Sequence, residues 1–494
     1  MNDSSAAHSA EQPPAPDSET FTSSAQSIVL GGRTVDYRAG AGTVIVRDDE
    51  HRPLASVFYI SYVAERREGE PRRPVTFFFN GGPGSASLWL NIGGFGPKRA
   101  PTRTPEATPP APYVVGDNPH SLLAQSDLVF IDAPGTGYSR LIGDATPDEL
   151  WGVDQDVDAF ARAITRYLTI TNNWNAPRFL FGESYGTTRA AALVHKLQNQ
   201  GLDFNGVVLL STMLNWGENH LGADQGFINM LPSFAASAWY HGRARTDATS
   251  LEAFLDEVRD FAQGPFAEAL QRGDRLTSDK EQLVAAQLSA YIGLDEEMLL
   301  KNRFRIGMEQ YRYALLADEG RVIGRFDTRF TADHQYVVGN GSHDPATDDA
   351  ATAGVNSAHL STFREHLVSD IGFTSELHYR HLYNMPISRA WNWYHKAPGI
   401  DAPSPVPDVS IDLSAALRRN TNLKVYVMGG YYDLATPFFG AEFDISHLYL
   451  APALRENVRF SFYESGHMTF VDEGEIVRMK RDLDAFYADA TATR

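Results

Sequence analysis

The chain has 494 residues and a formal net charge of −19, and no cluster of Lys or Arg interrupts this acidic balance. Such a charge repels phosphate backbones, which argues against nucleic acid as a partner. The chain contains no cysteine, which excludes disulfides, thiolate metal sites and cysteine nucleophiles.

The first segment, residues 1–25, is rich in Ser, Ala, Pro and acidic residues and shows no apolar period. We predict a disordered tail here. The segment also lacks the apolar core of a signal peptide, and no later run approaches the roughly 18 apolar residues of a membrane-spanning helix. We therefore expect no membrane partner and a cytoplasmic protein, or a periplasmic or secreted one if a leader has been removed.

Short strand-like runs follow the tail, and they read SIVLGG, TVIVRD and LASVFYISYV. Because glycines and charged turns separate them, we predict antiparallel strands at the edge of a sheet. Longer apolar runs come next, as is typical of strands in a sheet that is covered on both faces. These runs are residues 75–80, 127–132, 178–183, 206–211, 423–429 and 458–464.

Helical periods lie between the apolar runs, for instance over residues 156–168, 188–198 and 475–490. The alternation of strands and helices predicts an α/β fold with a mostly parallel central sheet flanked by helices. The alternation stops over residues 216–390, which read as mainly helical, and we predict an inserted cap there. The cap would separate a first part of the core, residues 26–215, from a second part, residues 391–494.

Residues 182–186 read Gly-Glu-Ser-Tyr-Gly and lie between an apolar strand and a helical run. In this context G-x-S-x-G is typical of the nucleophile elbow of the α/β-hydrolase fold, a tight strand-to-helix turn that exposes the serine. The helix N-terminus behind it supplies N–H groups for a developing oxyanion. We predict that Ser184 is a nucleophile; an ordinary tight turn is the alternative.

A serine hydroxyl needs a base to take its proton, and in this fold the acid and then the histidine follow the serine along the chain. Asp433 follows the strand 423–429, and His467 follows the strand 458–464. We predict that these two residues are the acid and the base, with Asp444 as the competing acid. No HExxH or other metal-binding spacing occurs, so we expect neither a metal nor a cofactor.

A glycine-rich loop, Asn-Gly-Gly-Pro-Gly-Ser at residues 80–85, follows the first long apolar strand. Its glycines let the backbone approach a ligand closely and point bare N–H groups at it. The loop is not a dinucleotide fingerprint, because the G-x-G-x-x-G spacing fails and Pro83 interrupts a helix start. Its place after an early strand predicts the second half of an oxyanion hole, with a tight surface loop as the alternative.

Four blocks together resemble the signature blocks of the serine carboxypeptidases. They are the loop 80–85, Phe-Ile-Asp-Ala-Pro-Gly-Thr-Gly-Tyr-Ser at 130–139, Gly-Glu-Ser-Tyr-Gly at 182–186 and Ser-Gly-His-Met at 465–468. Their order and spacing are similar to those of the family from about residue 75 to about residue 470. The stretch GRFDTRFT at 324–331, with HDPA at 343–346, resembles the bacterial branch.

The resemblance implies four groups of site residues. The catalytic triad would be Ser184, Asp433 and His467. The oxyanion hole would be formed by the N–H groups of Gly82 and Tyr185. The C-terminal carboxylate of the substrate would be bound by Asn80, the N–H of Gly81 and Glu183, and Met468 would line a side-chain pocket.

The sequence also departs from the family. Ser85 stands where eukaryotic members usually have a cysteine, and Gly94 stands where many members carry a glutamate. If that glutamate helps to bind the substrate carboxylate, fewer side chains bind this carboxylate in this chain.

An ionised Glu183 next to a substrate carboxylate would be a like-charge pair, so one of the two groups should hold a proton. This predicts that substrates bind better at acid pH.

The resemblance therefore implies a serine carboxypeptidase that acts on peptides with a free C-terminus, forms an acyl-enzyme on Ser184 and prefers acid pH. An acyltransferase or esterase would use the same acyl-enzyme and is the nearest alternative. A non-catalytic binding protein with a relic pocket is the remote one. The blocks alone do not separate a peptidase from an acyltransferase or esterase, because both would share them.

Overall fold

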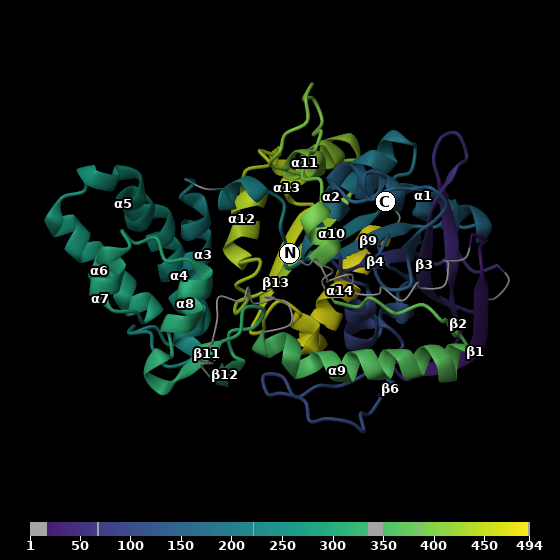
Figure 1. Ribbon diagram of the computed structural model, residues 1–494, viewed down its shortest axis with the longest axis horizontal. Helices are drawn as coiled ribbons and strands as arrows, with labels where there is room; N and C mark the ends of the chain where they lie inside the picture. The colour runs from purple at the N-terminus through teal and green to yellow at the C-terminus, as the bar shows by residue number, and fades with distance from the viewer. Residues whose placement is uncertain (1–16, 67–68, 221, 334–348, 383–384, 493–494) are drawn as a thin grey trace, which may run out of the picture.

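The computed structural model describes residues 17–66, 69–220, 222–333, 349–382 and 385–492 (Figure 1). Within these residues, ten strands form one sheet in the order β1-β2-β3-β7-β4-β9-β10-β13-β14, with β8 paired to β3. Its strands are β1 (Phe21–Leu30), β2 (Arg33–Arg47), β3 (Pro53–Ala64), β4 (Val75–Phe79), β7 (Asp127–Ile131), β8 (Arg140–Leu141), β9 (Arg178–Glu183), β10 (Gly206–Leu210), β13 (Lys424–Gly430) and β14 (Val458–Tyr463). Two small antiparallel pairs are β5 (Lys98–Arg99) with β6 (Gly116–Asp117), and β11 (Arg321–Ile323) with β12 (Thr331–Asp333).

The first three strands pair antiparallel at one edge of the sheet, as predicted. Gly31 and Gly32 connect β1 to β2, and both have positive φ (56° and 77°). Two-residue hairpin turns need this conformation because it matches the twist of the strands. The predicted tail over residues 1–25 is wrong at its end, since β1 begins at Phe21 and pairs with β2 from that residue. Residues 1–16 lie outside the described part of the chain.

The six long apolar runs are confirmed as strands. β7, β4, β9, β10, β13 and β14 pair in parallel. Successive side chains of a strand point to opposite faces, and in β4 Phe77 and Phe79 join one hydrophobic cluster whereas Phe78 joins another. Both faces are therefore covered, which explains why these runs are apolar at nearly every position.

Helices cover the two faces of the sheet. The cluster on the first face contains apolar residues of α1 (Val153–Ile170), α2 (Tyr185–Asn199) and α11 (Ser410–Arg419). The cluster on the second face contains residues of α14 (Glu475–Thr491), α9 (Ala350–Glu365), η1 (Trp89–Phe95) and η8 (His366–Ile371). The mostly parallel α/β architecture predicted from the sequence is thus confirmed.

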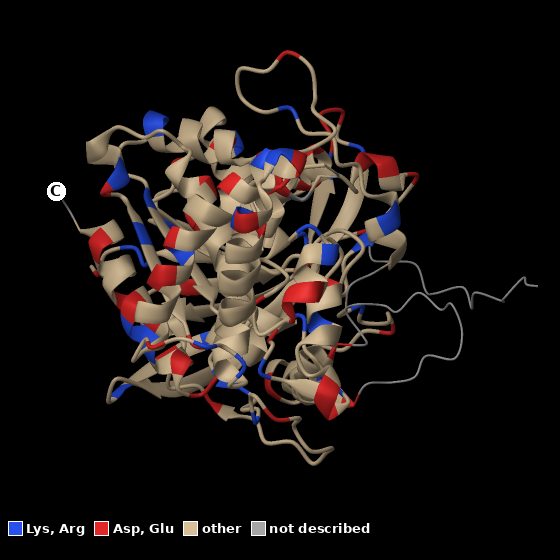
Figure 2. Ribbon diagram, turned by 90° about the vertical axis from the view of Figure 1, so that its left-hand side faces the viewer, with Lys and Arg blue, Asp and Glu red and all other residues tan. Residues whose placement is uncertain are grey.

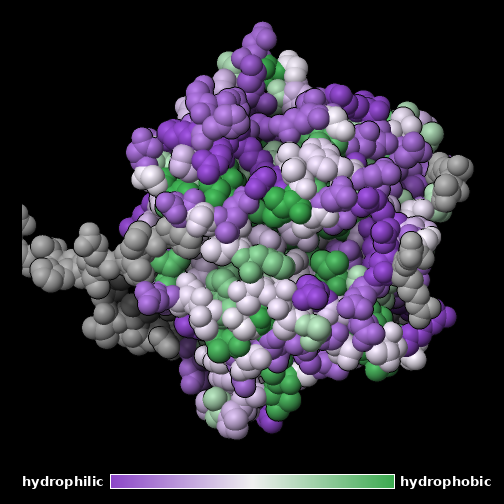
Figure 3. Space-filling model, turned by 90° about the vertical axis from the view of Figure 1, so that its right-hand side faces the viewer, coloured by the Kyte–Doolittle hydropathy of each residue, from purple (hydrophilic) through white to green (hydrophobic). Residues whose placement is uncertain are grey.

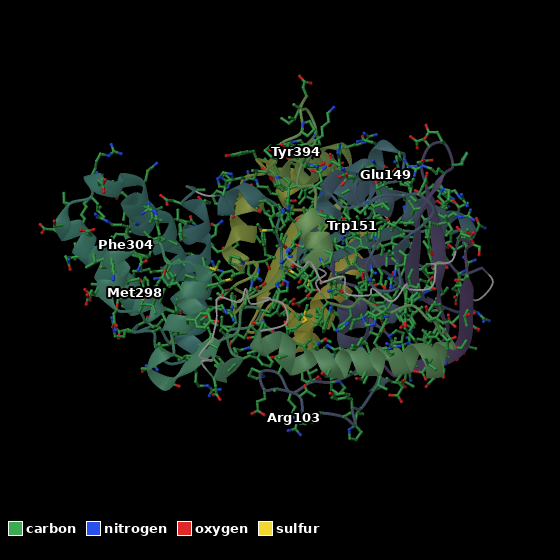
Figure 4. The ribbon with its side chains drawn as sticks, viewed as in Figure 1. Arg103, Glu149, Trp151, Met298, Phe304 and Tyr394 are labelled. Atoms are coloured by element: carbon green, nitrogen blue, oxygen red, sulfur yellow. The ribbon has the colours of Figure 1, made fainter. Side chains whose placement is uncertain are left out.

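A helical lobe, residues 225–314, stands beside the sheet at the left of Figure 1. It consists of α3 (Gln225–Tyr240), α4 (Leu251–Phe261), α5 (Ala267–Arg272), α6 (Ser278–Ile292), α7 (Glu296–Lys301) and α8 (Met308–Ala314). The lobe has its own hydrophobic cluster, which includes Met298 and Phe304 (Figure 4) and extends to α12 (Phe438–Ser446) of the core. The remaining helices are α10 (Met385–Ala390) and α13 (Pro452–Arg455).

The predicted cap over residues 216–390 does not form one unit in the structure. Its later part leaves the lobe, because α9 packs on η1 and η8 packs on β1 and β2 (Figure 1). The reason is that Val355, Phe363 and Leu367 join the hydrophobic cluster of the second sheet face. The predicted Gly/Asp-rich loop at 339–350 and the HDPA segment lie almost entirely outside the described residues.

The surface mixes charges and scattered apolar side chains. Figure 2 shows acidic and basic residues interspersed over the face that carries the lobe. Figure 3 shows mainly hydrophilic residues, with apolar ones between them, on the face of β1 and β2. None of the helices in the described ranges is both long enough and apolar enough to cross a membrane.

Candidate active site

Ser184 occupies a turn of one residue. β9 ends at Glu183 and α2 begins at Tyr185, so Ser184 alone connects the strand to the helix. Its backbone has φ 59° and ψ −130°, a conformation that residues with a side chain rarely adopt. The N–H of Ser184 donates to the carbonyl of Leu210 at 2.9 Å, which holds the strained residue to the neighbouring strand. The turn exposes the serine at the carboxyl end of the sheet.

The two glycines of the elbow are required by close backbone contacts. A Cβ on Gly182 would lie 2.1 Å from the carbonyl oxygen of Gly186. A Cβ on Gly186 would lie 2.6 Å from the carbonyl oxygen of Phe79 on β4. Any side chain would therefore push the strand and the helix apart.

Asp433 and His467 meet at the carboxyl ends of β13 and β14. Nδ1 of His467 lies 2.7 Å from Oδ2 of Asp433. Asp433 is completely buried, and its carboxylate also accepts from the backbone N–H groups of Ala435 (2.7 Å) and Thr436 (3.1 Å) and from the Thr436 hydroxyl (2.7 Å). These bonds fix the carboxylate, so the other ring nitrogen of His467, Nε2, points away from the acid.

The competing acid lies elsewhere. Asp444 accepts from the N–H of Asn215 at 3.2 Å and lies beside Glu218, and burial together with the charge of Glu218 holds its pKa well above the ordinary value. Burial lowers the pKa of His467, but the charge of Asp433, its hydrogen bond and the charge of Glu183 outweigh this effect. The pKa of His467 is therefore raised above its ordinary value.

A cavity of about 590 Å³ contains Ser184 and His467 in its wall. Every other predicted site residue except Asp433 also lines it. These are Asn80, Gly81, Gly82, Glu183, Tyr185 and Met468. The helical lobe supplies apolar wall residues on the other side, namely Phe227, Met230, Ile306 and Met308. Segments of the core and of the lobe therefore line the same cavity.

The glycine-rich loop lies against the elbow. A Cβ on Gly81 would lie 2.4 Å from the backbone nitrogen of Tyr185, so the loop and the start of α2 are in direct contact. Gly82 has φ 112°, which favours glycine. Tyr185 is the first residue of α2, and the first N–H groups of a helix have no partner within it. The backbone around Ser184 therefore consists of a glycine-rich loop and a helix N-terminus, the two elements that can supply the N–H donors of an oxyanion hole.

Asn80 and Glu183 form a buried polar pair in the cavity wall. The side-chain amide of Asn80 donates to Oε2 of Glu183, while Oε1 has no hydrogen-bond partner among the described residues. Burial is the main cause that raises the pKa of Glu183 to about 7; the charge of His467 lowers it and that of Asp433 raises it. A carboxyl group with this pKa can hold a proton near neutral pH and donate it to another carboxylate.

One part of the chain matches a known protein family. Residues 33–244 match the family model described as serine carboxypeptidase. The matched part is less than half of the chain. The signature blocks at 80–85, 130–139 and 182–186 fall within the matched range. No curated protein sequence matches the chain.

Three solved structures are similar to the chain, and the first of them has a TM-score above 0.5. A prohormone-processing carboxypeptidase from Saccharomyces cerevisiae is similar, with 14% identity, 92% of each chain covered and a TM-score of 0.54. A proline iminopeptidase from Mycobacterium smegmatis has 14% identity, 91% of this chain and 99% of that chain covered, and a TM-score of 0.37. A peroxisomal α/β-hydrolase from Saccharomyces cerevisiae has 11% identity, coverage of 97% and 92%, and a TM-score of 0.36. The fold is the α/β-hydrolase fold.

The departure from the serine carboxypeptidase pattern at Gly94 has a structural counterpart. A Cβ on Gly94 would lie 3.2 Å from the ring of Phe470. The ring therefore occupies the space into which a side chain at position 94 would grow. The carboxyl group that many members have here is absent, and Glu183 is left with Asn80 as its side-chain partner.

The GRFDTRFT segment contacts His467 and the loop around it. From the sequence, this segment was noted only for its resemblance to the bacterial branch of the family. The carbonyl of Phe326 accepts from the N–H of His467 at 2.6 Å, and its ring lies 5.0 Å from the imidazole, centroid to centroid. Arg329 forms ion pairs with Asp327 (2.8 Å) and Asp472 (2.9 Å). The segment thus holds the loop that carries His467, a role for which only the similarity to a family block gave a signal.

The individual residues of the apolar wall from the lobe were not predicted from the sequence. Residues such as Phe227 and Met308 follow an ordinary helical period, and nothing in that period distinguishes a cavity wall from a core. No group of three or more His, Asp or Glu side chains in the described ranges is arranged to hold a metal ion.

Proposed function

We propose that the chain is a serine carboxypeptidase that hydrolyses C-terminal peptide bonds through an acyl-enzyme on Ser184. The observation that carries this proposal is the buried Asn80–Glu183 pair, which lines the same cavity as Ser184 and His467. A serine hydrolase needs only a triad and an oxyanion hole for its chemistry. A protonated carboxyl group next to the nucleophile can in addition bind a carboxylate that the substrate brings.

The reaction follows from the positions of these groups. Nε2 of His467 takes the proton of the Ser184 hydroxyl as Oγ attacks the scissile carbonyl carbon. The N–H groups of Gly82 and Tyr185 stabilise the oxyanion of the tetrahedral intermediate. His467 then gives its proton to the leaving amine, the C–N bond breaks, and water releases the acyl group by the same steps in reverse order. Asp433 orients the imidazole throughout and stabilises its charged form.

Glu183 gives this mechanism a pH dependence. With a pKa of about 7, Glu183 is protonated at acid pH and donates to the substrate carboxylate, a charge-assisted hydrogen bond. Above that pH the proton leaves and the contact becomes a repulsion between two carboxylates. Peptide acids should therefore bind more weakly as pH rises, whereas peptide amides and esters should respond less.

A matched pair of peptides tests the proposal, one with a free C-terminal carboxylate and one with a C-terminal amide. We expect kcat/KM for the acid to fall relative to the amide as pH rises through about 7, the pKa given for Glu183. Glu183→Gln should reduce this difference, because the amide side chain carries no titrating proton. Ser184→Ala is the control, since its residual activity measures any other enzyme in the preparation. Parallel pH profiles for the two peptides in the wild type would contradict the carboxypeptidase proposal.

A second candidate is an esterase or acyltransferase that uses the same acyl-enzyme. The observation that favours it is the Phe470 ring against Gly94, which leaves the carboxylate site with one carboxyl group fewer than in many members of the family. Faster turnover of esters than of matched peptides, without a preference for a free C-terminus, would select this candidate.

A further inference from the structure

Arg325 is a cationic side chain in the wall of the cavity that contains Ser184, and it has no counter-ion among the residues that the structure describes. Its Nε is buried without a hydrogen-bond partner, and its guanidinium forms no ion pair within the described residues. It lies 5.3 Å from the ring centroid of the adjacent Phe326. Two neighbouring arginines differ: Arg329 pairs with Asp327 and Asp472, and Arg312 pairs with Glu309.

The chain has 62 acidic residues and 43 basic ones, yet no acidic side chain of the described residues pairs with the guanidinium of Arg325. Partial burial of a charged donor without an acceptor is unfavourable. Such an arrangement is expected where a ligand supplies the acceptor. Because the guanidinium presents a planar fork of donors, a carboxylate is the complementary ligand.

The backbone of Arg325 is fixed by two separate elements. Its N–H donates to the side chain of Asp349, which caps α9, and its carbonyl accepts from the N–H of Leu434 at 3.1 Å. The next residue, Phe326, contacts His467. The guanidinium is therefore held beside the catalytic histidine, and its charge acts to lower the pKa of that residue.

Arg325 approaches the cavity from a different side than the pair Asn80 and Glu183. That pair comes from the ends of β4 and β9, whereas Arg325 is attached to the loops after β13 and β14. The charges that act on the pKa of Glu183 are His467 and Asp433, and Arg325 acts on His467. Arg325, Ser184 and Glu183 line the same cavity, so a substrate whose C-terminal carboxylate meets Glu183 leaves Arg325 available to its acyl portion.

We propose that Arg325 is a specificity residue that binds the side-chain carboxylate of an acidic residue in the acyl portion of the substrate. This assignment rests on the proposed acyl transfer at Ser184. It predicts a preference for Glu or Asp before the scissile bond over their amides.

The test uses four peptides that carry Glu or Gln directly before the scissile bond and end in either an acid or an amide. We expect the wild type to favour Glu over Gln in kcat/KM by about tenfold to a hundredfold, as for a charge-assisted hydrogen bond. Arg325→Gln should abolish this ratio, and Arg325→Lys should keep part of it. Arg321→Gln, an exposed arginine on β11, is the matched control and should keep the full ratio.

Two results would overturn the proposal. One is a Glu-to-Gln ratio that does not change in Arg325→Gln, even if all rates fall, because this indicates a role only in holding Phe326 and His467. The other is a fall of the acid-to-amide ratio alone, which would place the α-carboxylate at Arg325. The same comparison with esters of acyl groups that carry Glu or Gln separates the two proposals: a ratio retained on esters, without peptide cleavage, would reject carboxypeptidase activity and keep Arg325 as the specificity residue.

Discussion

Ser184 has an unfavourable backbone conformation that its tightly packed neighbours hold in place. A residue in such a region of φ and ψ costs on the order of 1–3 kcal/mol, and it persists only where its surroundings fix it. Gly182 and Gly186 allow the close contacts that fix this turn. Packing around the elbow therefore offsets the cost of this conformation, and Ser184 stays in the wall of the cavity.

At the residue scale, the acid that orients His467 is predicted to be Asp433 and not Asp444, and mutation tests this choice. Asp433→Asn should reduce kcat/KM by about 10⁴, because an amide next to Nδ1 favours the wrong imidazole tautomer. Asp444→Asn should keep most activity, since Asp444 has a pKa well above its ordinary value and its protonated form resembles an amide in shape. Steady-state kinetics of both variants, with circular dichroism as the folding control, checks this prediction. Equal losses in the two variants would contradict it.

At the scale of elements, α2 is fixed to its neighbours by a buried ion pair. Arg189 of α2 forms an ion pair with Asp156 of α1 at 2.6 Å, and both side chains are almost completely buried. A second guanidinium nitrogen donates to the carbonyl of Asn80 at 2.8 Å. Loss of one partner of a buried pair leaves an uncompensated charge. This contact therefore couples the helix behind Ser184 to the glycine-rich loop.

A second polar contact joins α1 to α11 and makes stability depend on pH. His395 lies between Asp154 of α1 (2.6 Å) and Asp412 of α11 (2.8 Å). Burial lowers the pKa of His395, but the hydrogen bonds and charges of the two carboxylates outweigh it and raise this pKa to about 9. Because the folded pKa is above the ordinary value of about 6.5, the stabilisation is complete below that pH. It is lost as pH rises through about 9.

His395→Gln tests this contact. We expect a loss of about 1–3 kcal/mol in unfolding free energy at pH 6, the size of hydrogen bonds to charged groups. The thermal midpoint of the variant should therefore lie below that of the wild type at pH 6, and the difference should shrink at pH 10. Differential scanning calorimetry at both pH values measures it. A difference that is the same at pH 6 and pH 10 would show that His395 acts through packing alone.

At the scale of the whole molecule, the core supplies the candidate catalytic groups and the helical lobe supplies much of the apolar wall. Met230 and Met308 belong to the lobe and line the cavity. Met298 also belongs to the lobe (Figure 4) and packs against the same hydrophobic cluster as Met230 and Met308, but it is not among the residues that line the cavity. This arrangement predicts that changes in the lobe alter substrate choice and leave the chemistry at Ser184 intact.

The double variant Met230→Ala and Met308→Ala tests this division. We expect kcat/KM to fall by about tenfold for substrates with large apolar side chains, relative to substrates with small ones, because pocket contacts of this size contribute 1–3 kcal/mol. Labelling of Ser184 by a small fluorophosphonate should continue at a similar rate. Met298→Ala is the matched control, and it should change stability without changing substrate preference. A uniform fall for all substrates in the double variant would contradict the prediction.

Several features of this protein follow from the sequence because they depend on neighbours along the chain. The turn at residues 182–186 needs its glycines for steric reasons, and the pattern is readable from five residues. The parallel strands are readable because burial on both faces makes them apolar at nearly every position. The order of Ser184, Asp433 and His467 was predicted in the same way, and the structure places Asp433 and His467 in direct contact.

Other features were decided only by the tertiary structure, since they join residues that are far apart in the chain. The period of α9 shows that one side of this helix is apolar, but it does not specify what covers that side; the structure places it on the sheet. Arg325 lines the cavity that contains Ser184 because Asp349 and Leu434 hold its backbone there. The raised pKa of Glu183 arises from burial, which exists only after folding. Sequence patterns record local sterics and periodicity, whereas the partners of a buried charge are set by how the elements pack.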